Sequence, residues 1–503
     1  MRTELLVNAT PPETRVALLE DGRVVEVLHE RRSKSGLVGN VYLGRVHRVL
    51  PGMQAAFVSI GLERDAFLYV EDVTPRSPEF DFGDGAEAEA AQRGEDEETS
   101  RDERPRIDDL LKEGQEIVVQ VTKDPMGGKG PRVTAGISLP GRALVYLPLP
   151  GVREIGISRR ITDEAERERL RRILEALPAD GGFIARTAAQ SMREEDFQAD
   201  FRYLTDLAAR IARRRESVAA PALLHRELDL ASRSVRDLAG PDCAVVRVDD
   251  EGMYGRLKEL LEAIGPSNAA RLERFDRPEP IFEFFGVEAE IENALRSRVT
   301  LPSGGSLVIH QTEALVAIDV NTGRFVGKDA LEETVYAVNL EAVPEVARQI
   351  RLRDLGGLLV VDFIDMELPE HRAEVFARFE EELAKDRSRT RVLPLSEFGL
   401  IEVTRQRSRG NVERLLTRAC PACGGSGRVK TDLTLALDLR RELFAPPNLF
   451  TPGQTVRIRV QPSLAKLLAE EEPKILAEAQ ESLGVSLELL SDEGAVGYEV
   501  LKN

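Results

Sequence analysis

Two short apolar runs in this chain each end in an aspartate, and these two aspartates are the first candidates for chemistry. Residues 314–318 lead into Asp319, and residues 358–361 lead into Asp362. Each run is typical of a short buried strand with a carboxylate at its C-terminal end. If the strands are neighbours in one sheet, the two carboxylates lie close together and suit a hard divalent cation such as Mg²⁺.

The segment between the two runs supports this arrangement. Residues 330–353 have a helical pattern, and their number suits a crossover that joins two parallel strands. Aspartates also end strands because they favour turns. Spacing alone therefore leaves a metal site and an ordinary turn as open alternatives.

The length and composition indicate a protein of several domains. The chain has 503 residues, three cysteines and no tryptophan. Without a long apolar stretch or a disulfide framework, we expect a soluble cytoplasmic protein with no membrane segment. The N-terminus begins an alternating, strand-like pattern at once, so no signal peptide is expected.

The net charge of −18 comes mainly from two segments. Residues 79–103 hold eleven acidic residues and two arginines, and residues 470–503 hold nine acidic residues and two lysines. The remainder is nearly neutral, so its arginines can still form a local surface that binds phosphate. Residues 75–106 contain almost no large apolar residue, and we expect a flexible acidic loop there.

The N-terminal part of the chain reads as strands. They are expected at residues 3–9, 15–19, 44–61 (two strands around a Pro-Gly turn), 66–70 and 114–121. A glycine-rich turn follows and carries Lys123 and Lys129. Such a turn suits a phosphate backbone, although an ordinary solvated loop has the same composition.

A second possible phosphate site lies further along the chain. Strands are predicted near 143–147 and 182–187, and charged helices near 163–177 and 194–217. The second strand ends in Arg186 and Thr187, a guanidinium and a hydroxyl that together can bind a phosphate. Taken alone, this is weak support. We interpret the basic stretch 211–216 as a solvated helix surface.

Cys420 and Cys423 have the spacing of half a tetrahedral zinc site. A structural zinc needs four ligands, and Cys243 lies alone in an apolar strand at 243–248. The simplest solution is a zinc shared by two chains, each of which supplies two thiolates. A redox role is the alternative, but the surrounding sequence lacks the thioredoxin-like context.

Several motifs together resemble the ribonuclease E/G family. They are residues 301–306, 318–321, 351–357, 361–366 and 420–427, and they occur in the family's order. The resemblance extends from residue 39 to the end of the chain. It implies that Asp319 and Asp362 bind Mg²⁺ and that Asn321 is their hydrogen-bonding companion. Because no long disordered scaffold follows residues 431–503, we expect the ribonuclease G branch of the family.

The resemblance implies a multidomain α/β and β fold. It would combine an RNase H-like domain containing an inserted S1-type OB fold and a 5′ sensor, a DNase I-like catalytic domain, a zinc-link and a small α/β C-terminal domain. In this order, the expected parts are residues 1–38 with 231–294, 39–135, 136–230, 295–415, 416–430 and 431–503.

The resemblance also assigns contacts to RNA. Phe57 and Phe67 would stack on bases, although phenylalanine in an alternating strand is core by default. The expected backbone contacts come from Lys123, Lys129, Arg405 and Arg407. In the 5′ sensor, Arg186 and Thr187 would bind the 5′-monophosphate, and Val145 would pack against the terminal nucleotide.

The implied function is cleavage of single-stranded RNA by a Mg²⁺-dependent endoribonuclease. Its substrates would be rRNA precursors and mRNA, and it would prefer RNA that carries a 5′-monophosphate. Its products would have 5′-phosphate and 3′-hydroxyl ends. Zn²⁺ would join two chains into a dimer, or into a dimer of dimers. The alternative is a non-catalytic RNA-binding or ribosome-assembly factor on the same fold.

Overall fold

The computed structural model describes two compact units, Met1–Leu415 and Leu416–Asn503. The residues it does not describe are 1, 33–35, 74–104, 126–127, 149–152, 179, 191, 241, 265–270, 324–330, 397–398, 407–411, 446–449 and 502–503. The predicted acidic loop 75–106 lies almost entirely outside the described residues. Among the helices that are described, none is both long and apolar enough to cross a membrane.

The N-terminal strands share a sheet with a segment more than 200 residues later. The strand order is β15 (Arg271–Arg274), β14 (Cys243–Val248), β1 (Thr3–Ala9), β2 (Glu13–Glu20) and β3 (Arg23–Arg31). β1 pairs in parallel with β14, which joins the two segments of the predicted discontinuous domain. β2 and β3 form a hairpin, and its two turn residues, Asp21 and Gly22, both have positive φ. The helices here are α5 (Leu230–Leu238), α6 (Glu251–Ile264), α7 (Ile281–Phe284) and α8 (Val287–Ala294).

A closed five-stranded barrel is inserted between these segments. Its strands are β4 (Val41–Leu50), β5 (Ala55–Ser59), β6 (Ala66–Tyr69), β8 (Arg132–Thr134) and β7 (Glu116–Lys123), and β4 pairs with both β5 and β7. The short helices are α2 (Ile107–Leu110) and the 3₁₀ turns Pro51–Met53 and Val70–Asp72. β13 (Ala222–His225) pairs with the first residues of β4, Val41–Leu43. This barrel is consistent with the predicted OB-like fold.

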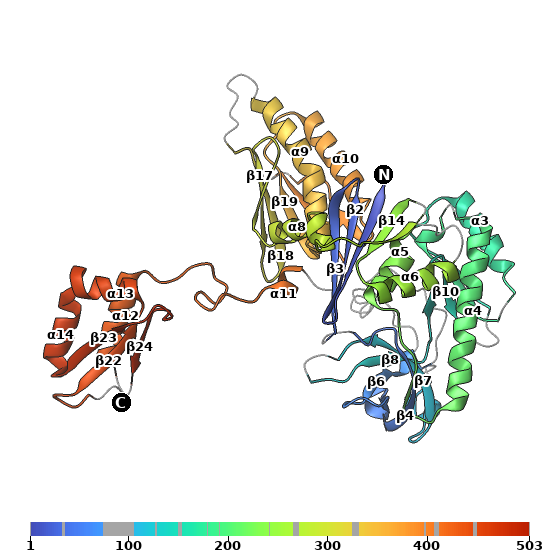
Figure 1. Cartoon of the computed structure of the whole chain (residues 1–503), viewed down its shortest axis with the longest axis horizontal. Coiled ribbons are helices and arrows are strands. Elements are labelled where there is room, and N and C mark those ends of the chain that lie inside the picture. Colours follow the sequence, from blue (N-terminus) through green and yellow to red (C-terminus); the bar gives the residue numbers. More distant parts are fainter. Residues whose placement is uncertain are drawn as a thin grey trace. The chain divides into compact units, whose positions relative to one another are not determined.

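The next layer is a small sheet in the order β11 (Ile155–Ile157), β12 (Gly182–Ala185), β10 (Leu144–Leu147) and β9 (Leu139–Pro140). It packs against α3 (Glu164–Glu175) and the 24-residue helix α4 (Glu194–Ser217), and the 3₁₀ turn Thr187–Ala189 follows β12. Figure 1 shows that α4 runs from this sheet to the barrel. The helix therefore connects the two parts.

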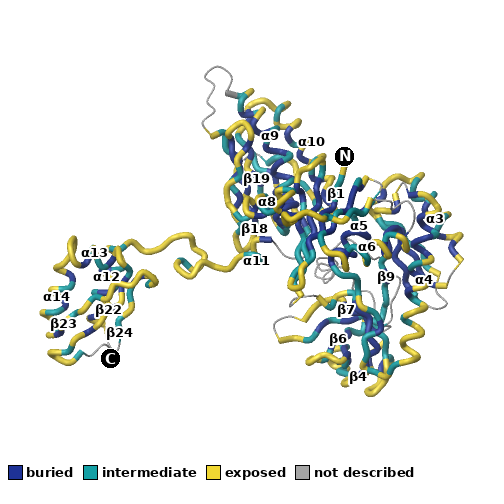
Figure 2. Tube along the Cα trace, viewed as in Figure 1, coloured by how far each residue is buried: buried dark blue, intermediate teal, exposed yellow. Residues whose placement is uncertain are grey.

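A six-stranded mixed sheet carries the two strand-end aspartates. Its order is β16 (Arg298–Thr300), β17 (Ser306–Gln311), β18 (Leu315–Asn321), β19 (Gly357–Asp362), β21 (Leu400–Arg405) and β20 (Thr390–Val392). The crossover α9 (Leu331–Leu352) and helix α10 (Pro369–Leu383) pack on one face, where Ile318, Leu359, Val346 and Phe379 share one core. Figure 2 shows this buried layer between helices and strands. The predicted strands and the crossover helix are confirmed.

The last unit has its own core. Its strand order is β23 (Ser486–Ser491), β22 (Thr455–Val460) and β24 (Tyr498–Leu501), and its helices are α12 (Asp432–Phe444), α13 (Pro462–Lys466), the π-helical turn Leu467–Glu471 and α14 (Pro473–Leu483). Leu439, Ile458 and Leu464 are completely buried in its core. The short helix α11 (Val412–Leu416) precedes this unit.

Candidate functional site

The two aspartates are direct neighbours in the central sheet. β18 and β19 run parallel, and Asp319 lies opposite Asp362 in their register. Ile318 and Val361 precede them and face the helices, so strand alternation turns both carboxylates to the opposite, uncovered face. Both aspartates are exposed there. The structure thus brings together the pair that the sequence suggested.

Two further side chains shape this carboxylate pair. Asn321 follows on the same face of β18, and its Nδ2 donates to Oδ2 of Asp319 at 2.8 Å. Partial burial, followed by the negative charges of Asp319 and Asp365, raises the pKa of Asp362. A cation between the carboxylates would relieve this repulsion. The sequence did not single out Asp365, although it follows Asp362 by only three residues.

This donor set fits Mg²⁺. Mg²⁺ is usually held by one or two carboxylates, while water and substrate phosphates supply the other oxygen ligands. Within the described ranges, no group of three or more His, Cys, Asp or Glu residues is placed to hold a metal ion. Asp319 and Asp362 are the two carboxylates that could hold such an ion, and Asp365 adds negative charge near Asp362.

The predicted phosphate-binding pair lies where β12 ends. Arg186 is partly exposed and Thr187 is exposed, so both can meet a phosphate from solvent. Arg186 Nη1 donates to Asp237 Oδ1 at 2.7 Å and also to the carbonyl of Gly141. The hydroxyl of Thr187 is hydrogen-bonded to that of Ser158 at 3.0 Å. These contacts fix both side chains before any ligand arrives.

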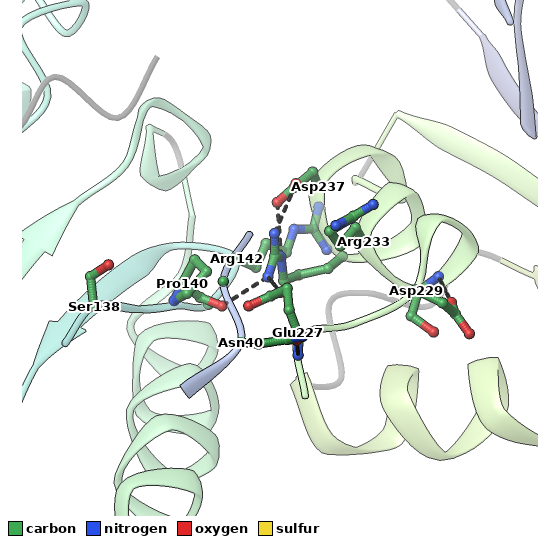
Figure 3. A network of polar contacts seen from close by, with 12 residues as sticks. Asn40, Ser138, Pro140, Arg142, Glu227, Asp229, Arg233 and Asp237 are labelled. Atoms are coloured by element: carbon green, nitrogen blue, oxygen red, sulfur yellow. Dashed lines mark hydrogen bonds and ion pairs between the residues drawn. The ribbon is translucent and has the colours of Figure 1, made fainter. Parts of the chain in front are cut away.

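Asp237, the partner of Arg186, belongs to a buried network of ion pairs. The Arg236 guanidinium donates to Asp237, to Glu227 at 3.3 Å and to the carbonyl of Pro140 at 3.1 Å. Figure 3 shows these three groups converging from separate segments. Although burial raises the pKa of Asp237, the guanidinium groups of Arg236 and Arg186 lower it further, so the carboxyl group stays ionised.

The position of Val145 differs from the one that its expected role in the 5′ sensor requires. It is completely buried and shares a small core with Leu147 and Ile184. The strand that carries it is buried along its whole length. A contact between Val145 and a terminal nucleotide therefore does not fit this structure.

The aromatic pair of the barrel is partly exposed. Phe57 and Phe67 are register partners on β5 and β6, with ring centroids 5.9 Å apart in an edge arrangement. Tyr69 lies beside Phe67, with centroids 6.5 Å apart and rings nearly parallel. Lys123 and Lys129 are exposed. This surface has the aromatic and basic composition of a single-strand binding face, and the sequence had not pointed to Tyr69.

Arg405, which was expected to contact RNA, is buried instead. Its guanidinium donates to Asp386 Oδ2 at 2.6 Å, to Asp354 Oδ1 at 2.8 Å and to the carbonyl of Leu355 at 2.9 Å. Removing one partner of such a buried pair typically costs about 3–5 kcal/mol. Arg405 therefore has a structural role here, and Arg407 lies outside the described residues.

The two cysteines lie in an exposed segment of the second unit (Figure 2). Cys420 is exposed and Cys423 is partly exposed, whereas Cys243 is buried in the other unit. Gly424, Gly425 and Gly427 have positive φ, which lets the backbone wrap around a bound atom. Backbone N–H groups of Gly427 and Gly425 lower the pKa of Cys423 and so favour the thiolate that zinc requires. The pair fits half of a zinc site.

Several known proteins are similar to this chain over nearly its full length. A family model described as the Ribonuclease E/G family matches residues 138–408. The chain is 42% identical to Ribonuclease G of Salmonella typhimurium (strain SL1344) over 485 residues, which cover 96% of each chain. It is 40% identical to Ribonuclease G of Haemophilus influenzae over 492 residues, 97% of each chain. Ribonuclease E of Escherichia coli (strain K12) is 35% identical over 471 residues, which cover 93% of this chain but 42% of that protein.

Proposed function

This chain belongs to the ribonuclease E/G family, and on that premise we propose that it is a Mg²⁺-dependent endoribonuclease that cuts single-stranded RNA. The predicted family and the closer resemblance to ribonuclease G are confirmed by the identities and by their coverage. The chain is thus an endoribonuclease, a hydrolase that acts on RNA. The observation that carries the finer proposal is the placement of Asp319 opposite Asp362 on an uncovered sheet face.

Each polar residue of this face has a part in the proposed reaction. Asp319 and Asp362 would hold the ion, and the amide of Asn321 fixes the orientation of the Asp319 carboxylate. When bound, Mg²⁺ supplies an activated water and stabilises the charge that develops on the phosphate. Because both carboxylates are exposed, a phosphodiester can reach them. Cleavage by this route leaves a 5′-phosphate and a 3′-hydroxyl.

The remaining surfaces suit a single-stranded substrate. Phe57 and Phe67 offer aromatic faces for stacking, with Lys123 and Lys129 nearby on the barrel for the phosphate backbone. We assign rRNA precursors and mRNA as substrates by analogy with the family. The cysteine half-site supports a Zn²⁺-linked dimer, or a dimer of dimers.

We also propose that a 5′-monophosphate stimulates cleavage, and a path of contacts supports this. Ser158, the partner of Thr187, begins a loop in which Arg160 reaches the residues next to β20. Arg160 Nη2 donates to the carbonyl of Ser388 at 3.2 Å, and Nη1 donates to that of Arg387. The adjacent Asp386 binds Arg405 on β21, whose other end pairs with β19 at Asp362. These contacts connect the sensor to the strand that carries Asp362.

Cleavage of a short 5′-monophosphorylated RNA tests the proposed function. With Mg²⁺, we expect new fragments that carry 5′-phosphate and 3′-hydroxyl ends. EDTA should abolish them, because the two carboxylates alone cannot activate water. An RNA that is bound but remains intact in Mg²⁺ would favour the RNA-binding or assembly factor, and full cleavage in EDTA would reject the metal mechanism.

A variant of Arg186 tests the 5′ sensor. Arg186→Gln should remove the preference for RNA with a 5′-monophosphate over RNA with a 5′-hydroxyl. In the wild-type protein we expect a charge-assisted contact of this kind to make the two cleavage rates differ by about tenfold or more. The fold should survive, because Asp237 keeps Arg236 as a partner. Rates on both substrates give the answer, with Arg172→Gln, an exposed arginine on α3, as the control. If Arg186→Gln slows both substrates equally, Arg186 is not a sensor.

A further inference from the structure

The C-terminal half of α4 forms one wall of an open groove of about 460 Å³. Leu207, Ile211 and Leu224 supply apolar lining, and the polar lining comes from Arg210, Arg213, Arg214, Ser217 and His225. Ile211 also packs with Val41, Leu43 and Leu224, so this part of the helix is fixed against β4 and β13. The basic stretch that read as a solvated surface therefore borders a defined concave site.

The arginines of this groove lack acidic partners. Among the residues that the structure describes, Arg210, Arg213 and Arg214 make no ion pair, and Arg214 donates only to the carbonyl of Leu223 at 2.9 Å. Neighbouring α3 differs, because three of its four arginines pair with the glutamate three residues earlier. The helix dipole favours basic residues in the last turn, Arg214 and Arg215. It does not account for Arg210 and Arg213, so their unneutralised charge favours an anionic ligand.

The helix that carries the groove contacts both the sheet of the proposed sensor and the barrel. At its sensor end, α4 is bound through Asp200, whose carboxylate accepts from the backbone N–H groups of Arg142, Ala143 and Leu144 at 2.8–3.0 Å. Arg213 follows Asp200 by a distance of about 20 Å along the helix. There, α4 contacts β13, which pairs with barrel strand β4. An RNA that reaches from the sensor to the barrel can follow this helix.

We propose that the basic groove lined by Arg210, Arg213 and Arg214 binds the phosphate backbone of single-stranded RNA between the 5′ sensor and the barrel. This inference rests on the proposed function, since it takes RNA as the ligand. The contacts are electrostatic and independent of base identity, because the groove offers guanidinium groups and lacks stacked aromatic rings in its lining. The site therefore adds affinity for RNA of any sequence.

Binding of a 20-nucleotide 5′-monophosphorylated RNA, measured by fluorescence anisotropy in EDTA, tests the groove. The double substitution Arg210→Gln, Arg213→Gln should weaken binding on the order of tenfold at 0.1 M salt. Loss of two phosphate contacts should reduce the slope of log affinity against log salt by about 1.4, given roughly 0.7 per contact for single strands. Changing both arginines to lysine should restore most of the slope, because the contacts depend on charge.

The matched control is Arg202→Gln with Arg215→Gln, which removes two exposed arginines of the same helix that do not line the groove. It should keep nearly the wild-type salt slope. If the groove and control variants weaken binding equally, the effect is general charge and the groove is rejected while the proposed function stands. If wild type itself neither binds nor cuts this RNA, the proposed function fails as well.

Discussion

Replacing Asp319 or Asp362 with asparagine should lower the rate of RNA cleavage by roughly 10³-fold, while the affinity for RNA stays close to wild type. Asparagine keeps the size of the side chain but removes one of the two negative charges that hold the ion. The surfaces of the barrel and sensor that we propose bind RNA lie on other sheets, so binding should persist. Single-turnover cleavage and anisotropy in the same buffer measure both effects.

Glu402→Gln is a suitable control for this pair. Glu402 is exposed on β21 and lies opposite Val360. The substitution therefore removes a negative charge from the same face and leaves both aspartates in place. Its rate should remain within a few fold of wild type. Near wild-type turnover by the Asp319 or Asp362 variant at moderate Mg²⁺ would show that the catalytic centre lies elsewhere.

The second large effect concerns assembly. The double variant Cys420→Ser, Cys423→Ser should lose zinc and shift from dimer or higher towards monomer, because each chain offers only half of a four-thiolate site. It should also lose much of its activity if each RNA is held by domains of two chains. Cys243→Ser is the control, since that buried thiol lies in β14, outside the segment with the pair.

Metal analysis combined with light scattering decides this prediction. A shared site gives one zinc for every two chains in the wild-type protein. One zinc per chain would instead indicate that other ligands of the same chain complete the site. If the double substitution leaves the molecular mass unchanged, the chains are not joined through a zinc at these cysteines.

The carboxylate pair was predictable because its geometry follows from local patterns. Parallel strands are usually joined by a helical crossover, and parallel neighbours bring their C-terminal ends together. The structure adds that the two strands are direct neighbours, which places Asp319 beside Asp362. The strands of the barrel and the long helix α4 followed in the same way from alternating or helical periodicity, whereas the barrel fold was implied by the family resemblance.

The burial of Arg405 and Val145 was not predictable from the sequence, because their surroundings are set by distant residues. The partners of Arg405 are 19 and 51 positions away in the sequence, so its ion pairs are not visible in the local pattern. Val145 belongs to a strand that is covered on both faces, and four apolar residues in a row do not show which face meets a ligand.

The basic groove was hidden for a related reason. The arginines of α4 are plain in the sequence, but a cluster of charges on a helix is most often a solvated surface. Only the packing of Ile211 against Leu224 and the barrel turns that cluster into the wall of a groove. Function here depends on tertiary contacts rather than on composition.

Binding of Mn²⁺, followed by its electron paramagnetic resonance signal, tests the carboxylate pair most directly. Mn²⁺ prefers the same oxygen ligands as Mg²⁺ and reports occupancy without any RNA. We expect the wild-type protein to bind Mn²⁺ at a site that Mg²⁺ competes for, and Asp362→Asn to weaken that binding by about tenfold or more. Equal Mn²⁺ affinity in wild type, Asp319→Asn and Asp362→Asn would contradict the assignment of these carboxylates as the metal site.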